Sequence, residues 1–168
     1  MGEQTETLRD ALERCGAEFM NYGPSPSEGG IAVAESFGAY EAEYAAIRQR
    51  VGILHAPQRG VVRCTGDDRQ DFLHRMVSCD VNGLSAGEST RGFQLSDKGR
   101  IVADLMIHHG SEDTWIETDR FDIDRLIELL DARLFTEDLT LEDMSGQRQK
   151  LALHGPAAVA LLRQVVDE

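Results

Sequence analysis

The residues best suited to chemistry lie between Phe93 and His109, in the segment FQLSDKGRIVADLMIHH. Two β-rich runs flank Ser96-Asp97-Lys98-Gly99, a composition typical of a tight turn. In the second run Asp104 stands among apolar residues. Because an unpaired buried carboxylate costs free energy, Asp104 must either have a partner or serve a function. The segment therefore predicts a β-hairpin with one polar position that requires an explanation.

The cysteines and histidines do not form a recognisable ligand set. The three cysteines are Cys15, Cys64 and Cys79, which are widely spaced and contain no CxxC pair. Cys15 and Cys64 are expected in the core, and Cys79 closer to the surface. His108 and His109 are adjacent in a predicted strand, so their side chains point to opposite faces. The sequence predicts neither a disulfide framework nor a metal site.

Composition narrows the class of protein. The chain has 168 residues and a formal net charge of −13, from 30 acidic and 17 basic residues. This length suits about one domain with a real core. Strong acidity repels phosphate backbones and disfavours direct nucleic-acid binding. The charged N-terminus has no apolar signal core, and no apolar run of about 18 residues suggests a membrane span. We expect a cytoplasmic protein.

The order of predicted elements indicates an α+β fold with an antiparallel or mixed sheet and covering helices. Asp67 and Gln70 form a capping-box pattern at one helix start. Helices are expected over 5–15, 41–50, from 67 onward, over 121–135 and after 155–156; strands over 60–65, 90–109, 114–118, 139–144 and 150–154; and a loop over 21–30. We expect an N-terminal helix and loop over 1–38 and a main α+β unit over 39–168.

The last predicted helix is apolar and runs to the end of the sequence. An apolar helix is normally buried against another element. We therefore expect that the core is completed by a further half of the protein or by a partner chain, and that residues 157–166 expose apolar surface when alone.

Four segments together resemble one family. They are residues 43–84, which include DFLHRMVSCDVNGL, residues 93–107, residues 114–130, and residues 139–158, which include LALHGPAA. In order and spacing they resemble the N-terminal half of the glycine-cleavage T protein superfamily, the tetrahydrofolate-dependent aminomethyltransferases and their relatives. The resemblance implies the N-terminal half of a T-protein-like folate-binding fold, with tetrahydrofolate or a derivative as the cofactor.

The same resemblance implies that a catalytic carboxylate is missing. In the family, the strand after the hairpin turn usually carries two consecutive aspartates, the first of which supports the one-carbon chemistry. Aligned on Gly99 and Leu105, the second is Asp104 and the first falls on Ala103. Alanine can neither accept a proton nor stabilise an iminium ion, so ordinary glycine cleavage is not expected and no catalytic residue is assigned.

Strand alternation assigns these residues to two faces. Ile101, Ala103, Leu105 and Ile107 share one face, and Asp104 lies on the other. The resemblance places the pterin on the first face, whose apolar residues suit stacking against a flat ring. Asp104 then has a structural role, either capping a helix or pairing with an arginine.

Three further positions follow from the resemblance. Arg59 either faces the carboxylate tail of a folate or pairs with solvent or a glutamate. Glu117 replaces a family asparagine, and Leu95 matches an apolar pocket position that is expected in the core in any case. The expected cofactor-binding residues are Arg59, Leu95, Ala103, Leu105, Ile107 and Glu117.

The pattern DKGRI-x-AD fits the non-catalytic, YgfZ-type branch of the family better than the catalytic T protein. The leading hypothesis is a folate-binding protein that supports iron–sulfur proteins, its clients. The branch signature K-G-C-Y-x-G-Q-E lies further along than residue 168. One alternative is an aminomethyltransferase or a demethylase-associated enzyme that uses another carboxylate, such as Glu117. The other is a truncated interaction module that binds no ligand.

Overall fold

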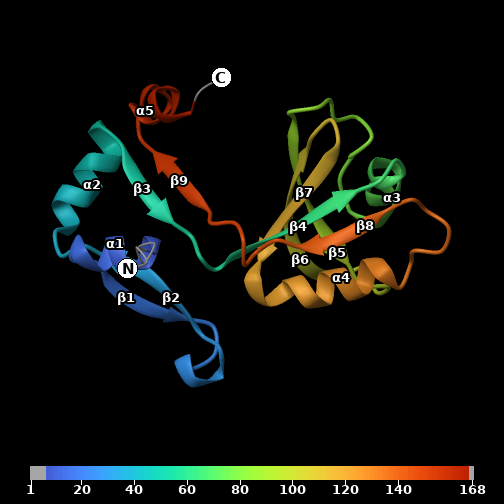
Figure 1. The fold of residues 1–168 in the computed structure, drawn as a ribbon, viewed down its shortest axis with the longest axis horizontal. Coiled ribbons are helices and arrows are strands. Elements are labelled where there is room, and N and C mark those ends of the chain that lie inside the picture. Colours follow the sequence, from blue (N-terminus) through green and yellow to red (C-terminus); the bar gives the residue numbers. More distant parts are fainter. Residues whose placement is uncertain (1–6, 167–168) are drawn as a thin grey trace, which may run out of the picture. The chain divides into compact units, whose positions relative to one another are not determined.

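A computed structural model describes residues 7–166, which form two compact units. Of the described residues, unit 1 comprises 7–57 and 150–166, and unit 2 comprises 58–149. The boundary expected near residue 38 falls inside unit 1, between β2 and α2. The helices and strands of each unit are shown in Figure 1.

Unit 2 is built on one five-stranded sheet in the order β5-β6-β7-β4-β8 (Figure 1). All neighbouring strands are antiparallel. The strands are β4 (Arg59–Thr65), β5 (Ser89–Leu95), β6 (Ile101–His109), β7 (Asp113–Asp119) and β8 (Thr140–Asp143), and the helices are α3 (Arg69–Met76), the 3-10 turn η2 (Arg120–Asp122) and α4 (Ile123–Asp131). The predicted antiparallel sheet with covering helices is confirmed.

The core of unit 2 lies between the inner face of this sheet and helices α3 and α4. Alternate residues of β4, β6 and β7 are fully or almost fully buried, because strand side chains alternate between the two faces. The buried apolar cluster consists of Val62, Cys64, Phe72, Leu73, Val81, Ala103, Leu105, Ile107, Ile116, Ile123, Leu126 and Leu130. This burial fixes which side of the sheet faces inward.

The hairpin predicted over 90–109 is present as β5 and β6. Its turn closes through the Gly99 N–H, which donates to the Ser96 carbonyl oxygen over 2.8 Å. Gly99 has φ +70°, a left-handed conformation that glycine adopts without the steric cost a side chain would bring.

Two predicted details of the helices are wrong. The capping box at α3 does not form, because the N-cap is Asp68, one residue after Asp67, and its side chain makes no capping hydrogen bond. The Gln70 amide donates to the carbonyls of Val81 and Leu84, each over 3.0 Å. Gln70 therefore fastens the turn that follows α3. The helix predicted over 121–135 is shorter, because α4 ends at Asp131. Leu134 lies beyond the end of α4 and packs against the core.

Unit 1 contains two separate two-stranded antiparallel sheets, β1–β2 and β3–β9. Its elements are α1 (Leu8–Arg14), β1 (Glu18–Tyr22), the 3-10 turn η1 (Pro26–Glu28), β2 (Ile31–Ser36), α2 (Tyr40–Gln49), β3 (Gly52–His55), β9 (Leu151–His154) and α5 (Ala158–Val165). The strands β1, β2 and β3 were not predicted. Each is short, and β1, which pairs with the next strand β2, has no clear alternation of buried and exposed positions.

Unit 1 buries little apolar surface among its described residues. Its buried apolar side chains are Val33 and Ala56, and helices α1, α2 and α5 have no buried residue. Cys15 is exposed, so its expected place in a core is wrong. On α5, Val159 is 61% exposed and Val165 is 70% exposed. The exposed apolar surface predicted for this helix is therefore present.

None of the helices in the described part of the chain has the length and apolar character needed to span a membrane.

We predict that Leu126→Ala, in the fully buried face of α4, destabilises unit 2 by about 2–5 kcal/mol. The lost methyl groups leave a cavity between the helix and the sheet. Denaturant unfolding followed by the fluorescence of Trp115, the only tryptophan, measures the change. Phe135→Ala is the control, since Phe135 is 85% exposed. Equal losses in both variants would contradict the packing described for α4.

We also predict a pH dependence that originates at Glu137. Its carboxylate accepts hydrogen bonds from the backbone N–H groups of Phe135 and Thr136 and from Arg75, and these bonds lower the pKa of Glu137 from 4.5 to about 2. The folded state thus favours the charged form. The resulting stabilisation is complete above about pH 4.5 and is lost as the pH falls towards 2.

Glu137→Gln removes this titration. The free energy of unfolding of the variant should fall less steeply than that of the wild type between about pH 4.5 and pH 2. Equal slopes in acid denaturation would show that Glu137 does not contribute.

Candidate functional site

The candidate site is the outer face of the five-stranded sheet of unit 2. Helices α3 and α4 pack on the inner face. Strand alternation directs to this face Arg59, Val61 and Arg63 of β4, Arg91 and Phe93 of β5, Asp104, Met106 and His108 of β6, and Trp115 and Glu117 of β7. The outer face thus combines charged groups with a few apolar side chains.

Arg59 and Glu117 form an ion pair across β4 and β7. Arg59 Nε donates to Glu117 Oε1 over 2.8 Å. The two side chains are 25% and 14% exposed, so solvent screens the pair less than it screens a fully exposed one. Of the two alternatives for Arg59, the structure contains the glutamate partner.

Arg91 and Asp104 form a second ion pair, on β5 and β6. The guanidinium binds the carboxylate through two nitrogens, and the Nε–Oδ1 distance is 3.0 Å. The hydrogen bonds from Arg91, with a contribution from Arg59, lower the pKa of Asp104. Asp104 is therefore ionised at neutral pH. Its predicted pairing with an arginine is confirmed.

The residues expected to stack against a pterin lie in the core instead. Ala103 is 2% exposed, and Leu105 and Ile107 are 0% exposed. They pack in the buried cluster between the sheet and the helices, so a ligand contact by their side chains would require the core to open. The face assignment therefore needs correction: the outward carboxylate of β6 is Asp104, and position 103 points inward. The sequence contained this signal, because an Ile-Ala-Leu-Ile face is typical of a core.

Leu95 also departs from its expected place. It ends β5 beside the hairpin turn, next to an irregularity in the register, and is 37% exposed. The expectation that Leu95 belongs to the core is therefore wrong. It lies four residues along β5 from Arg91, towards the turn.

A second polar group on the outer face surrounds Trp115. The guanidinium carbons of Arg63 and Arg148 lie 5.7 Å and 5.1 Å from the centre of its ring. Arg63 Nε also donates to Asp113 Oδ2 over 3.1 Å. These cation–π contacts hold the arginines over the indole. Sequence reasoning did not single out this group, since its members come from different strands and a loop.

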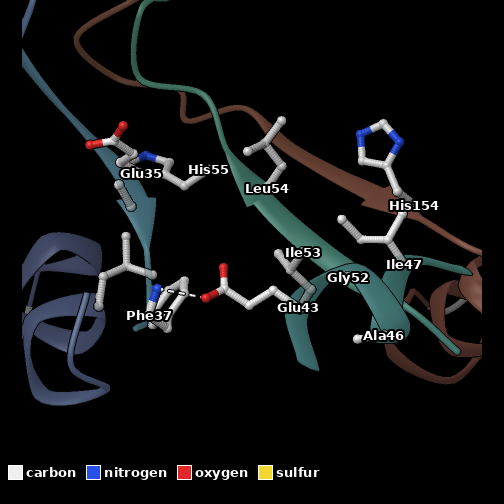
Figure 2. Close-up of a pocket in the computed structure, with 12 residues that line it drawn as sticks. Glu35, Phe37, Glu43, Ala46, Ile47, Gly52, Ile53, Leu54, His55 and His154 are labelled. Atoms are coloured by element: carbon white, nitrogen blue, oxygen red, sulfur yellow. Dashed lines mark hydrogen bonds between the residues drawn. The ribbon is translucent and has the colours of Figure 1, made fainter. Parts of the chain in front are cut away.

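Unit 1 contains a separate pocket of about 330 Å³, lined mainly by apolar residues of β2, α2 and β3. Figure 2 shows Glu43 reaching towards the backbone of Phe37. The Glu43 carboxylate accepts from the N–H groups of Phe37 and Ala39 and from the Ser36 hydroxyl. Glu43 thus holds the chain that enters α2. None of the sequence-predicted site residues lines this pocket.

The cysteines do not form a reactive centre. Burial raises the pKa of the Cys64 thiol to about 12, so it remains protonated at neutral pH. Burial also raises the pKa of Cys79. In the described part of the chain, no three histidine, cysteine or acidic side chains lie together in a way that suits a metal ion.

Known proteins are similar in sequence to almost the whole of this chain. An aminomethyltransferase of Halalkalibacterium halodurans is 26% identical over 162 residues, which are 96% of this chain and 42% of the relative. An aminomethyltransferase of Bacillus pumilus is 25% identical over 162 residues, which are 96% of this chain and 43% of the relative. The chain thus spans less than half the length of these relatives.

The crystal structure of the glycine cleavage system aminomethyltransferase T from Bartonella henselae has a similar fold. The TM-score is 0.81 at 20% sequence identity, and the match covers 94% of this chain and 42% of that one. This supports the predicted fold, the N-terminal half of the T protein. The family model of the GCVT N-terminal domain matches residues 8–168, so the chain belongs to the GCVT N-terminal domain family.

Proposed function

We propose that the outer face of the unit 2 sheet forms part of a binding site for tetrahydrofolate or a derivative. The observation that carries this proposal is the presence of two ion pairs, Arg59–Glu117 and Arg91–Asp104, on the sheet face opposite to helices α3 and α4. Membership of the GCVT family and the two aminomethyltransferase relatives favour a folate as the ligand.

The chemistry of the face suits such a ligand. The carboxylates of Asp104 and Glu117 can accept hydrogen bonds from ring N–H and amino groups. Met106, which lies opposite Glu117 and two residues from Asp104 on β6, offers an apolar contact for a flat ring. Arg59 offers a cation for the carboxylate of the glutamyl tail.

Further polypeptide completes the site in this proposal, because the chain spans 42% of its relative's length. The remaining half of the protein, or a partner chain, supplies the other walls. The exposed apolar residues of α5 in unit 1 favour such an addition, since exposed apolar patches commonly mark interaction surfaces.

In the first candidate function, the protein binds folate and does not catalyse a reaction. In this form the protein acts in the cytoplasm and supports iron–sulfur client proteins, as the YgfZ-type pattern with Ala103 suggests. Position 103 is a core position here, so this candidate rests on the sequence pattern and not on a carboxylate missing from the outer face.

The second candidate is one-carbon transfer to tetrahydrofolate. The outward position of Asp104 and Glu117 favours it. An ionised carboxylate, such as Asp104 with its lowered pKa, is suited to stabilising a developing cation and is a poor proton donor.

We predict that tetrahydrofolate gives saturable heat in calorimetry with this chain or with a longer gene product that contains it. Met106→Arg places a bulky cation in the middle of the face and should raise the Kd by about tenfold or more. Ile101→Arg, on the exposed end of the same strand, is the matched control and should keep the wild-type Kd. No heat with the wild type, or equal Kd values for the two variants, would contradict the proposed site.

An assay of methylene transfer to tetrahydrofolate separates the two roles. If the protein is an enzyme, we expect Asp104→Asn to lower kcat by about 10²-fold, because it removes the charge that faces the developing cation. Glu117→Gln tests the other carboxylate in the same assay. Absence of transfer by the wild type would exclude the enzymatic candidate and leave the binding role.

A further inference from the structure

One residue from each strand of the unit 2 sheet stands in a single row across the outer face. From β5 to β8, the strand register places these residues side by side: Ser89, His108, Trp115, Arg63 and Glu142. The row lies at the end of the sheet away from the β5–β6 turn. Its arginine is four residues, about 13 Å along β4, from Arg59. The row is therefore a second group on this face.

Two guanidinium groups gather over the indole in the centre of the row. The guanidinium carbon of Arg63 lies 5.7 Å from the ring centre of Trp115, and that of Arg148, in the loop after β8, lies 5.1 Å from it. An arginine that contacts a ring still presents N–H donors at the edge of its planar fork. Because two like charges beside one ring repel each other, an anion that contacts both would stabilise the pair.

Two carboxylates moderate this positive charge. Asp113 Oδ2 accepts from Arg63 Nε over 3.1 Å and offsets part of the charge of that arginine. Glu142 is exposed and lies opposite Arg63 in the β4–β8 register, where it repels an approaching anion. We therefore expect weak, reversible binding of an anion at this site.

A phosphate monoester suits the two arginines better than a carboxylate does. A phosphate group carries a charge of about −1.5 to −2 at pH 7 and three acceptor oxygens. A carboxylate has a single charge and two oxygens, which one arginine can bind bidentately. The net charge of −13 disfavours a long phosphate backbone, so the ligand class that fits is a small molecule.

The other end of the row offers hydrogen bonds to the remainder of such a molecule. Ser89 Oγ and His108 Nδ1 are 2.8 Å apart, and both residues are exposed. A hydroxyl and an imidazole can each exchange hydrogen bonds with the hydroxyl groups of a ligand. Ser89 lies two strand spacings, about 10 Å, from Trp115, within reach of a small phosphorylated alcohol.

We propose that Arg63 and Arg148, ordered over Trp115, bind the phosphate group of a small phosphate monoester. Ser89 and His108 contact the hydroxyl groups of its alcohol part. This site does not depend on folate binding, because its residues and its ligand class differ from those of the proposed function.

The fluorescence of Trp115, the only tryptophan, tests the proposal. The whole chain is titrated with glycerol 3-phosphate and with inorganic phosphate, and sodium chloride keeps the ionic strength constant. We expect a saturable change with a Kd of about 1 mM. Arg148→Gln should raise this Kd about tenfold or more, because a charge-assisted hydrogen bond is lost. Glu142→Gln should lower it about twofold to fivefold, because a like charge is removed.

Arg100→Gln is the matched control. Arg100 is exposed beside the β5–β6 turn, so this variant removes the same charge at the other end of the sheet and should keep the wild-type Kd. Arg148→Lys retains the charge without the planar fork and should give an intermediate Kd; it also serves if Arg148→Gln fails to fold. Phosphorus NMR of the same samples detects any binding that leaves the fluorescence unchanged.

The outcomes decide both parts of the proposal. Absence of saturable binding of either probe, or equal Kd values for Arg148→Gln and Arg100→Gln, would overturn the phosphate site. Tighter binding of glycerol 3-phosphate than of inorganic phosphate, with the difference lost in Ser89→Ala, would support the monoester as the ligand. Equal Kd values for the two probes would assign the site to free phosphate and overturn the role of Ser89 and His108.

Discussion

The burial of one face of the unit 2 sheet against α3 and α4 is the constraint on which the rest of this unit depends. Leu105, Ile107 and Ile116 are completely buried against residues of the two helices, such as Leu126. Because strand side chains alternate, each buried residue forces its neighbours outward. A shift of one residue in any strand would exchange the two faces, so the apolar core specifies the register and, with it, the polar outer face.

The outer face has a different physical character, since it carries charges that are satisfied within the sheet. Arg59 and Glu117 are 58 positions apart in sequence and meet because β4 and β7 are neighbours. Both side chains are partly withdrawn from water, where an unpaired charge is costly. The pairing therefore keeps two charged groups on a half-buried surface and orders them. An ordered arginine is more useful for recognition than one that samples many rotamers.

The two units differ in how they are stabilised. Unit 2 has a continuous core of twelve buried apolar residues. In unit 1 the sheets have two strands each and the described helices bury no residue, although several carry large apolar side chains. Two-stranded sheets have little stability of their own and normally need further strands or a covering helix. This contrast is consistent with a family whose members match this chain over less than half their length.

The sequence alone determined much of unit 2. The hairpin, the third strand and a helix within 121–135 follow from local turn chemistry and apolar periodicity, which do not need distant partners. The order of the sequence motifs likewise showed the resemblance to the T protein superfamily, and the family model confirms this resemblance. Unit 1 was less predictable, because β1 and β3 are short and β3 takes its pairing from β9, near the other end of the chain.

Only the tertiary structure decided which side of the sheet is the candidate site. Periodicity separates Ala103 from Asp104, and the apolar side of β6 favours a core, but only the packing of the distant helices α3 and α4 decides that protein, and not a ligand, covers this side. Once α3 and α4 occupy the apolar side, Ala103 becomes a core residue and Asp104 an outward carboxylate. The partnership of Arg59 with Glu117 was decided in the same way, by the neighbouring positions of β4 and β7, which no local pattern in the sequence encodes.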